Sequence, residues 1–328
     1  MPSPASSTPS PASPLAGADR TGVLAGFASY ALWGAFPFYF AALVPAGAVE
    51  VLAHRVLWAL LVCAVLLTAL RRWGPVVRVL RTPALLGPLS VAAAAIALNW
   101  GVYAWAATTG HVLEAALGYF VNPLVTVLLG VLVLRERLRR AQWAAVAVGA
   151  VAVVVITADL GRLPWVALTL AGSFATYGLL KNRLARSPAG RVDALTGLSV
   201  ETVVLALPAA AALAVIGAGG ASTFTGHGPL HTALMALLGV TTVVPLLLFA
   251  VAAGRVPLTL IGLLQYLTPV LQFLAGLALG ERMPASQWVG FALVWVALLV
   301  LTSDALRTAS RGRRSARAGT AAGVPPAQ

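Results

Sequence analysis

Charge is scarce in this sequence. Asp, Glu, Lys and Arg make up only 9% of the 328 residues, whereas 60% are hydrophobic. A soluble domain of this size needs about 25% charged residues to cover its surface, so the composition excludes an ordinary soluble protein. Cysteine is scarcer still, because Cys63 is the only one and lies inside an apolar run. A single cysteine excludes an intrachain disulfide and a thiolate metal cluster.

Several catalytic signatures are missing too. No Gly-x4-Gly-Lys-Ser/Thr loop is present to hold phosphates, which argues against ATP as the direct energy source. There is neither a His-Glu-x2-His motif nor a Gly-x-Ser-x-Gly elbow. His227 and His231 have the spacing of metal ligands, but no carboxylate or cysteine stands near them in the sequence. We therefore expect a solvated loop there, no metal site and no cofactor.

Long apolar runs, in contrast, are abundant. Ten of them come close to the ~20 residues that an α-helix needs to cross the ~30 Å hydrocarbon core of a bilayer. They predict an all-α membrane protein with ten transmembrane helices. The predicted helices cover residues 22–44, 49–70, 84–107, 112–134, 141–158, 163–181, 195–216, 230–253, 257–280 and 285–303.

Basic residues are distributed unevenly between the two sides of this layout. Only Arg162 and Arg282 fall in the connections of one side, and Arg55 lies inside a predicted span. The other 19 of the 22 Lys and Arg residues fall on the other side or in the terminal segments. The positive-inside rule therefore predicts a multi-pass plasma-membrane protein with both termini in the cytoplasm. Because these arginines lie in short turns and a tail, the net charge of +13 does not indicate nucleic acid as a partner.

An internal repeat organises the chain. Residues 117–143, LGYFVNPLVTVLLGVLVLRERLRRAQW, and 264–288, LQYLTPVLQFLAGLALGERMPASQW, share an order of signals: an aromatic residue, a proline, an apolar run, Glu-Arg and Gln-Trp. Pro123 and Pro269 are 146 residues apart. A unit of five helices crosses the membrane an odd number of times, so its second copy is inverted. Inverted repeats are typical of transporters, in which the two halves exchange conformations.

Several local strings carry a resemblance to a known family. They are YALWG at 30–34, EVLAHRVLW at 50–58, NW at 99–100, LGYFVNP at 117–123, PW at 164–165, YGLLK at 177–181 and GLSVET at 197–202. Together with the five-plus-five arrangement, they resemble the EamA-type drug/metabolite transporter superfamily, and its RarD branch in particular. The resemblance covers about residues 20–304. Ala115-Ala116 and Asn182 depart from it, where a serine and another basic residue are expected.

This resemblance implies ten helices and a secondary transporter of small organic solutes, often an exporter. Chloramphenicol handling is an association of the family only. The chain then divides into a disordered cytoplasmic tail (residues 1–20), a first EamA-like five-helix repeat (21–158), a second one (159–304) and a basic disordered cytoplasmic tail (305–328).

Four ionisable residues lie within or at the start of predicted spans. A charge inside the membrane costs free energy, so each of these residues is expected to have a functional or structural role. Glu50 and His54 share one helix face, which predicts a proton- or substrate-responsive pair, with Arg55 as an anchor for a carboxylate or phosphate group. The alternative is structural, with a helix-start glutamate favoured by the dipole and a His and an Arg that tie helices together. Glu201 lies about two turns inside its helix, so it must be protonated or paired there.

Further glutamates lie at predicted helix ends. Glu114, with His111 three residues before it, is either half of a capping pair or part of a gate or proton relay. Glu136 and Glu281 are 145 residues apart and are strong repeat markers. We expect them to be exposed turn residues that cap and orient the following helix.

Polar and aromatic residues recur on single helix faces and predict the lining of a solute cavity. The candidates for substrate binding are Trp33, Asn99, Tyr103, Tyr119, Asn122, Tyr177, Gln265 and Tyr266, in addition to Glu50, His54, Arg55 and Glu201. The alternative is that Tyr and Trp form interface belts while the polar residues bond helices together. For Trp100, Trp143, Trp165 and Trp288, near predicted helix ends, we favour the belt.

Prolines and paired glycines mark places where helices bend or approach. Pro37, Pro123, Pro245 and Pro269 lie within predicted spans and are candidate kinks about which helices bend during access switching. The pairs Gly22/Gly26 and Gly276/Gly280 predict close helix contacts within one chain or between two, which leaves a homodimer open.

Two functions remain. The first is a secondary active transporter that moves metabolites, amino acids or drugs by alternating access, in exchange with protons. The second is an intramembrane enzyme acting on lipid-linked substrates, with Glu50, His54 or Glu201 as its acid or base. The enzyme requires these groups to cluster at one membrane depth, whereas the sequence scatters them.

Overall fold

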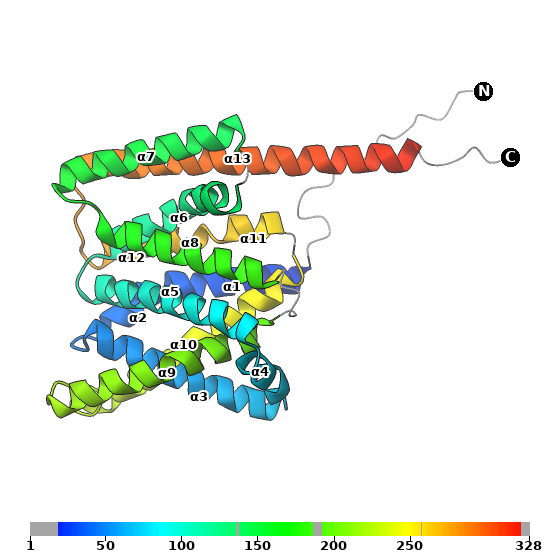
Figure 1. Cartoon of the computed structure of the whole chain (residues 1–328). Coiled ribbons are helices and arrows are strands. Elements are labelled where there is room, and N and C mark those ends of the chain that lie inside the picture. The colour runs from blue at the N-terminus through cyan, green and yellow to red at the C-terminus, as the bar shows by residue number, and fades with distance from the viewer. Residues whose placement is uncertain (1–18, 136–137, 186–191, 257, 323–328) are drawn as a thin grey trace, which may run out of the picture.

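Helices make up all the regular structure of the described residues of the computed structural model, which are 19–135, 138–185, 192–256 and 258–322. In Figure 1 they run back and forth between two ends of one bundle. The elements are α1 (Arg20–Gly34), α2 (Phe36–Ala41), α3 (Ala48–Ala69), α4 (Trp73–Leu80), α5 (Pro83–Thr108), α6 (Val112–Leu134), α7 (Arg140–Leu160), α8 (Trp165–Ala185), α9 (Ala194–Ala218), α10 (Gly228–Ala253), α11 (Leu258–Leu264), α12 (Leu267–Ala278) and α13 (Ala285–Ala322).

The described residues contain nine helical segments that are long and apolar enough to cross a membrane. One of these consists of α1 and α2 together, and another runs through most of α11 and α12. The tenth predicted span, 163–181, is present as α8, which at 21 residues is long enough but more polar than the others. We call the end of the bundle that holds α4 and the start of α1 the terminal end, at the right of Figure 1, and the other the opposite end.

Two spans are interrupted, and each interruption lies next to a proline. The first span breaks at Ala35, and Pro37 stands in the first turn of α2. The ninth breaks at Gln265–Tyr266, four residues before Pro269. Proline has no N–H to bond the carbonyl four residues earlier, which weakens the helix there. Helices α6 and α10 continue through Pro123 and Pro245 without a break, so two of the four candidate kinks coincide with interruptions.

Helix α4 was not predicted, because its stretch of sequence reads as a basic connection. It buries Val76 and Val79 while its arginine side faces outward, as in an amphipathic surface helix. Arg72, at its start, forms an ion pair with Asp193, the N-cap of α9, at 3.3 Å. Partial burial raises the pKa of Asp193, but hydrogen bonds from Thr196 and the charge of Arg72 outweigh it and hold the pKa below its usual value.

The end of the chain differs from the prediction as well. Residues 305–322 continue α13 as helix, whereas we expected a disordered tail from 305. This part of the prediction was wrong, because alanine and arginine favour the helix and the preceding span removes the cost of nucleation. The N-terminal tail, residues 1–18, and residues 323–328 lie outside the described residues.

The packing of helices follows the sequence repeat. Helix α1 packs against α10 and α12, and its repeat equivalent α8 packs against α5 and α6, the equivalents of α10 and α12. Helices α7 and α13 are equivalent to each other and pack together as a pair. Such an exchange of partners is the geometry of two inverted five-helix repeats.

Small residues allow these helices to approach closely. A Cβ at Gly239 of α10 would lie 2.4 Å from the backbone carbonyl of Trp58 in α3. Gly22, Gly26 and Gly276 likewise face side chains of this same chain, whereas Gly280 ends its segment at a positive φ of 90° with open space around it. Three of the four paired glycines therefore mark contacts within the chain.

Candidate functional site

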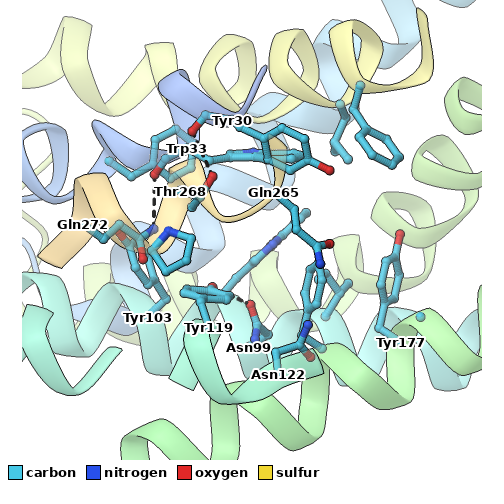
Figure 2. Close-up of a pocket in the computed structure, with 18 of the residues that line it drawn as sticks. Tyr30, Trp33, Asn99, Tyr103, Tyr119, Asn122, Tyr177, Gln265, Thr268 and Gln272 are labelled. Atoms are coloured by element: carbon cyan, nitrogen blue, oxygen red, sulfur yellow. Dashed lines mark hydrogen bonds between the residues drawn. The ribbon is translucent and has the colours of Figure 1, made fainter. Parts of the chain in front are cut away.

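A cavity of about 440 Å³ lies between the two repeats, and Figure 2 shows its lining. This volume falls in the ~300–1,000 Å³ range of small-molecule sites. Helices α5, α6, α8 and α12 contribute most of the lining residues, and α1, α9 and α10 add others. Ten aromatic side chains line it, namely Tyr30, Trp33, Phe36, Trp100, Tyr103, Tyr119, Phe174, Tyr177, Phe249 and Tyr266.

Equivalent positions of the two repeats line this cavity together. Trp33 and Tyr177, 144 residues apart in the sequence, both contribute to it, as do Asn122 and Thr268, which are 146 apart. The same holds for Tyr30 with Phe174, Tyr119 with Gln265, and Pro123 with Pro269. The cavity therefore lies where the two inverted copies face each other.

Asn99 connects three of the surrounding helices. It accepts a hydrogen bond from the Tyr119 hydroxyl at 3.0 Å, drawn in Figure 2, and its amide nitrogen donates to the Leu170 carbonyl at 3.0 Å and to Ser173 Oγ at 3.2 Å. A buried amide that satisfies partners on α6 and α8 fixes the orientation of both. The ring of Tyr119 is thereby held against the cavity.

The broken first span is joined to the broken ninth span by side chains. Gln272 Nε2 donates to the carbonyl of Trp33 at 3.2 Å, which is the carbonyl that Pro37 leaves without its helical donor. Thr268 Oγ1 donates to the Tyr30 carbonyl at 2.8 Å. The Gln272 bond thus replaces the helical bond that the proline removes, and the Thr268 bond adds a second link between the repeats.

Arg55 is a charged residue in the buried part of the lining. It is only 4% exposed, and its Nε donates to Thr242 Oγ1 at 2.9 Å. The guanidinium lies over the ring of Trp100 at 4.1 Å from the centroid and over Phe36 at 5.4 Å. Trp100 is therefore part of the cavity, so the interface belt that we favoured for it was wrong. A tryptophan eight residues from its helix end can point inward as readily as outward, and sequence position alone does not decide this.

A second charged group lies toward the terminal end. Lys181 lines the cavity, and its ammonium forms an ion pair with Glu201 at 2.7 Å. The Tyr177 hydroxyl also donates to Glu201, at 3.3 Å. Glu201 is 2% exposed and thus paired, as its place within a span requires, but it lies behind the lining rather than in it.

Glu50 and His54 do not line the cavity. The Glu50 carboxylate accepts hydrogen bonds from Thr223 N, Thr223 Oγ1 and Ser222 Oγ at 2.8–3.0 Å. His54 stacks on Phe224 and accepts a bond from Trp58 Nε1 at 3.2 Å. Both residues thus hold the start of α3 to the loop between α9 and α10. This agrees with the structural alternative for the pair rather than with a role in binding solute or protons. His231 is buried beside them against Thr223, so the solvated loop predicted for it was wrong.

Two more glutamates join the repeats at the opposite end. Glu281 accepts bonds from the backbone amides of Val112 and Leu113, at 2.5 and 2.8 Å, and so caps α6. Our expectation that it caps the helix that follows it was wrong, because its carboxylate binds the free amides at the start of α6 instead. Glu114 binds Arg162 at 2.9 Å and the amide of Val166 at 3.2 Å. Glu136 lies outside the described residues.

Burial differs between the two ends of the cavity. Phe36, Tyr103 and Gln272, toward the opposite end, are buried, whereas Lys181 and Ala194, toward the terminal end, are partly or fully exposed. The cavity is therefore closed at the opposite end and accessible from the terminal end. The described residues contain no group of three or more His, Cys, Asp or Glu side chains that could hold a metal ion.

Nine of the twelve candidate residues line this cavity, and Glu50, His54 and Glu201 do not. Several lining residues, including Tyr30, Phe174 and Phe249, are not among these candidates, and the sequence pattern predicts Lys181 to lie in a basic turn. A signal for the first two existed. Tyr30 and Phe174 stand three residues before the equivalent pair Trp33 and Tyr177, one helical turn away on the same face.

Comparison with known proteins agrees with this architecture. Protein RarD of Streptomyces exfoliatus is 51% identical over 93% of this chain and 96% of its own length. The profile of the EamA-like transporter family matches residues 20–158. The chain belongs to this family, in its RarD branch. It is thus a multi-pass membrane protein related to transporters rather than to enzymes.

Two further members of the RarD branch share less of this sequence. Protein RarD of Escherichia coli is 40% identical over 89% of this chain and 97% of its own. A chloramphenicol-sensitive protein RarD of Pseudomonas aeruginosa is 33% identical over 91% of this chain and 98% of its own. A crystal structure at 20% identity superposes with a TM-score of 0.57, covering 88% of this chain and 98% of that chain, which shows the shared fold.

Proposed function

We propose that this EamA-family protein is a secondary active transporter that exports small organic solutes by alternating access. One observation carries the proposal: equivalent positions of two inverted repeats line a single cavity that is closed at one end. If the two repeats exchange conformations, the contacts that now close the opposite end form at the terminal end instead, and the cavity opens on the other side.

The direction of loading follows from the charge distribution. The positive-inside rule places the terminal end, with α4 and most of the basic turns, in the cytoplasm. The cavity then faces the cytoplasm, the side from which an exporter takes up its solute. Three glutamates, Glu50, Glu114 and Glu281, close the outer side through bonds to the other repeat.

Exchange with protons accounts for the energy of transport in this proposal. Glu201 is buried against Lys181, which itself lines the cavity. A movement of Lys181 away from Glu201 would leave a buried carboxylate that is neutralised most readily by a proton. This pair is thus the place where solute binding and proton binding would be coupled.

The test is solute flux across a membrane. The full chain is purified and reconstituted in vesicles. The vesicles are loaded with a broad panel of metabolites, amino acids and drugs. Chloramphenicol is included because one relative is named for sensitivity to it. We expect saturable efflux of at least one solute, faster with an opposing proton gradient. Vesicles that show no saturable flux across the panel, with or without the gradient, contradict the proposal.

The geometry does not support the rival function, that of an intramembrane enzyme. Its acid or base candidates lie apart, since Glu50 binds the loop at the opposite end while Glu201 lies near the terminal end of α9. The ionisable groups are therefore not gathered around one reacting atom.

A further inference from the structure

The charge of the cavity indicates what kind of solute it takes, an inference that rests on the proposed transport function. Two charged side chains line the described surface, Arg55 and Lys181, and both are cations. Lys181 is compensated by the carboxylate of Glu201 at 2.7 Å. Arg55 forms no ion pair with a described residue; the carboxylate closest to it along α3, that of Glu50, is held by Ser222 and Thr223. The cavity therefore carries one uncompensated positive charge.

The groups around Arg55 leave its charge open to a ligand. Thr242 accepts from Nε and leaves the two terminal amino groups of the guanidinium for other acceptors. Trp100 and Phe36 offer only ring faces. Cation–π contacts attract the guanidinium but do not neutralise it, and they are weaker than the cost of removing a full charge from water. A carboxylate matches the planar fork in geometry and in charge.

Three polar atoms of the lining are buried without a hydrogen-bond partner. They are the hydroxyl of Tyr103 and the amide oxygens of Asn122 and Gln272. Buried polar atoms are normally satisfied, so unpaired ones on residues that line a cavity are available to a bound solute or water as partner. The hydroxyl of Tyr103 can donate to a second carboxylate oxygen, and the two amide oxygens can accept from N–H or O–H groups of the same solute.

The remainder of the surface suits a flat apolar body. Ten aromatic rings surround the cavity, and Figure 2 shows Trp33, Tyr119 and Tyr177 around the same space. Rings that face a cavity bind planar solutes by stacking and by burial of apolar area. We propose that the solute is an organic anion with a carboxylate held by Arg55 and a flat ring held between the aromatic side chains.

A matched set of probes separates charge from shape. Phenylacetate, phenylacetamide, phenethylamine and phenylalanine share one ring and differ in carrying an anion, a neutral amide, a cation or a zwitterion. Binding of each to the purified full chain is measured by calorimetry in detergent. We expect the two carboxylates to bind at least about tenfold more tightly than the amide, because a charge-assisted bidentate bond is lost. The amine should bind most weakly.

Variants then identify the residue responsible. Arg55→Gln should remove the preference for the acid over the amide, and Arg55→Lys should retain part of it. Arg282→Gln, at an exposed turn outside the cavity, is the matched control and should change nothing. Equal binding of acid and amide by the native protein overturns the proposal, as does no binding of any probe, or an unchanged preference in folded Arg55→Gln.

These results differ from those of the flux test. A protein that transports a neutral or cationic solute of the broad panel, while ignoring the carboxylates, keeps the proposed function and refutes the anionic solute. If Arg55→Gln does not fold, the order of affinities in the native protein still decides the matter.

Discussion

The Glu281 carboxylate accepts a hydrogen bond from the backbone amide of Val112 at 2.5 Å. This bond spans 169 residues of sequence and joins one repeat to the other. It also accepts a hydrogen bond from the next amide, that of Leu113. These amides belong to the first turn of α6, where helical N–H groups have no partner within the helix and attract a negative charge. One glutamate thus closes the bundle at the opposite end by satisfying a helix of the other half.

Glu281→Gln should therefore loosen the closed end. A hydrogen bond to a charged group contributes about 1.5–3 kcal/mol, so we expect the outward-accessible population to rise about tenfold. The measurement is the rate at which an impermeant maleimide added outside labels a cysteine placed at Gln265 in the cavity. Native Cys63 is buried and contributes little background.

Arg282→Gln is the matched control for this experiment. It removes a charge from the adjacent residue, which is exposed. An equal effect of both substitutions, or no effect of Glu281→Gln, would show that the cap does not hold the closed state.

The ion pair between Lys181 and Glu201 predicts a non-additive result. Glu201 is 2% exposed and the Lys181 side chain 30%, so the pair is only partly screened by water. Removing one partner leaves an uncompensated charge, and we expect either Lys181→Met or Glu201→Gln to lower stability by roughly 2 kcal/mol. The double variant should be more stable than either single variant. Thermal unfolding in detergent measures this, and additive losses would contradict it.

The close approach of α3 and α10 predicts a steric effect. A methyl group at Gly239 would lie 2.4 Å from the Trp58 carbonyl, a backbone atom that cannot move alone. Gly239→Ala should therefore lower the free energy of unfolding by about 1–3 kcal/mol. Gly172→Ala is the control, since nothing lies within 4 Å of the added carbon. Equal melting temperatures for the two variants would show that the helices separate without cost.

The orientation can be tested with two single cysteines. Arg282→Cys is next to Glu281, which binds the start of α6 at the opposite end, and Arg78→Cys is on α4 at the terminal end. If the positive-inside rule holds, impermeant maleimide labels the first in intact cells and the second only after permeabilisation. Labelling of both from the same side would refute the topology, and the inverted repeat with it.

Much of the fold was predictable because the information is local. Helix ends such as Val112 and Ala253 agree with the apolar runs to within a residue or two, since hydropathy and proline positions act over one turn. The repeat also predicted that Pro123 and Pro269 occupy equivalent places, and both line the cavity. Helix α4 was missed because eight residues give too short a pattern to separate a helix from a connection.

The partners of buried polar groups were not predictable. Nothing near Glu50 in the sequence indicates Thr223 as its donor, and nothing near Arg55 indicates Trp100 as the ring beneath it. Such contacts depend on how helices rotate about their axes, and a rotation of less than half a turn moves a side chain from the lipid to the cavity.

By itself, then, the sequence determined that this chain lies in a membrane, how many times it crosses, and that it consists of two inverted copies, because apolar length and charge placement act residue by residue. Only the tertiary structure decided which end of the cavity is closed and that Arg55 faces it without a counter-charge. Those properties arise from residues on different helices that meet only after the helices have packed.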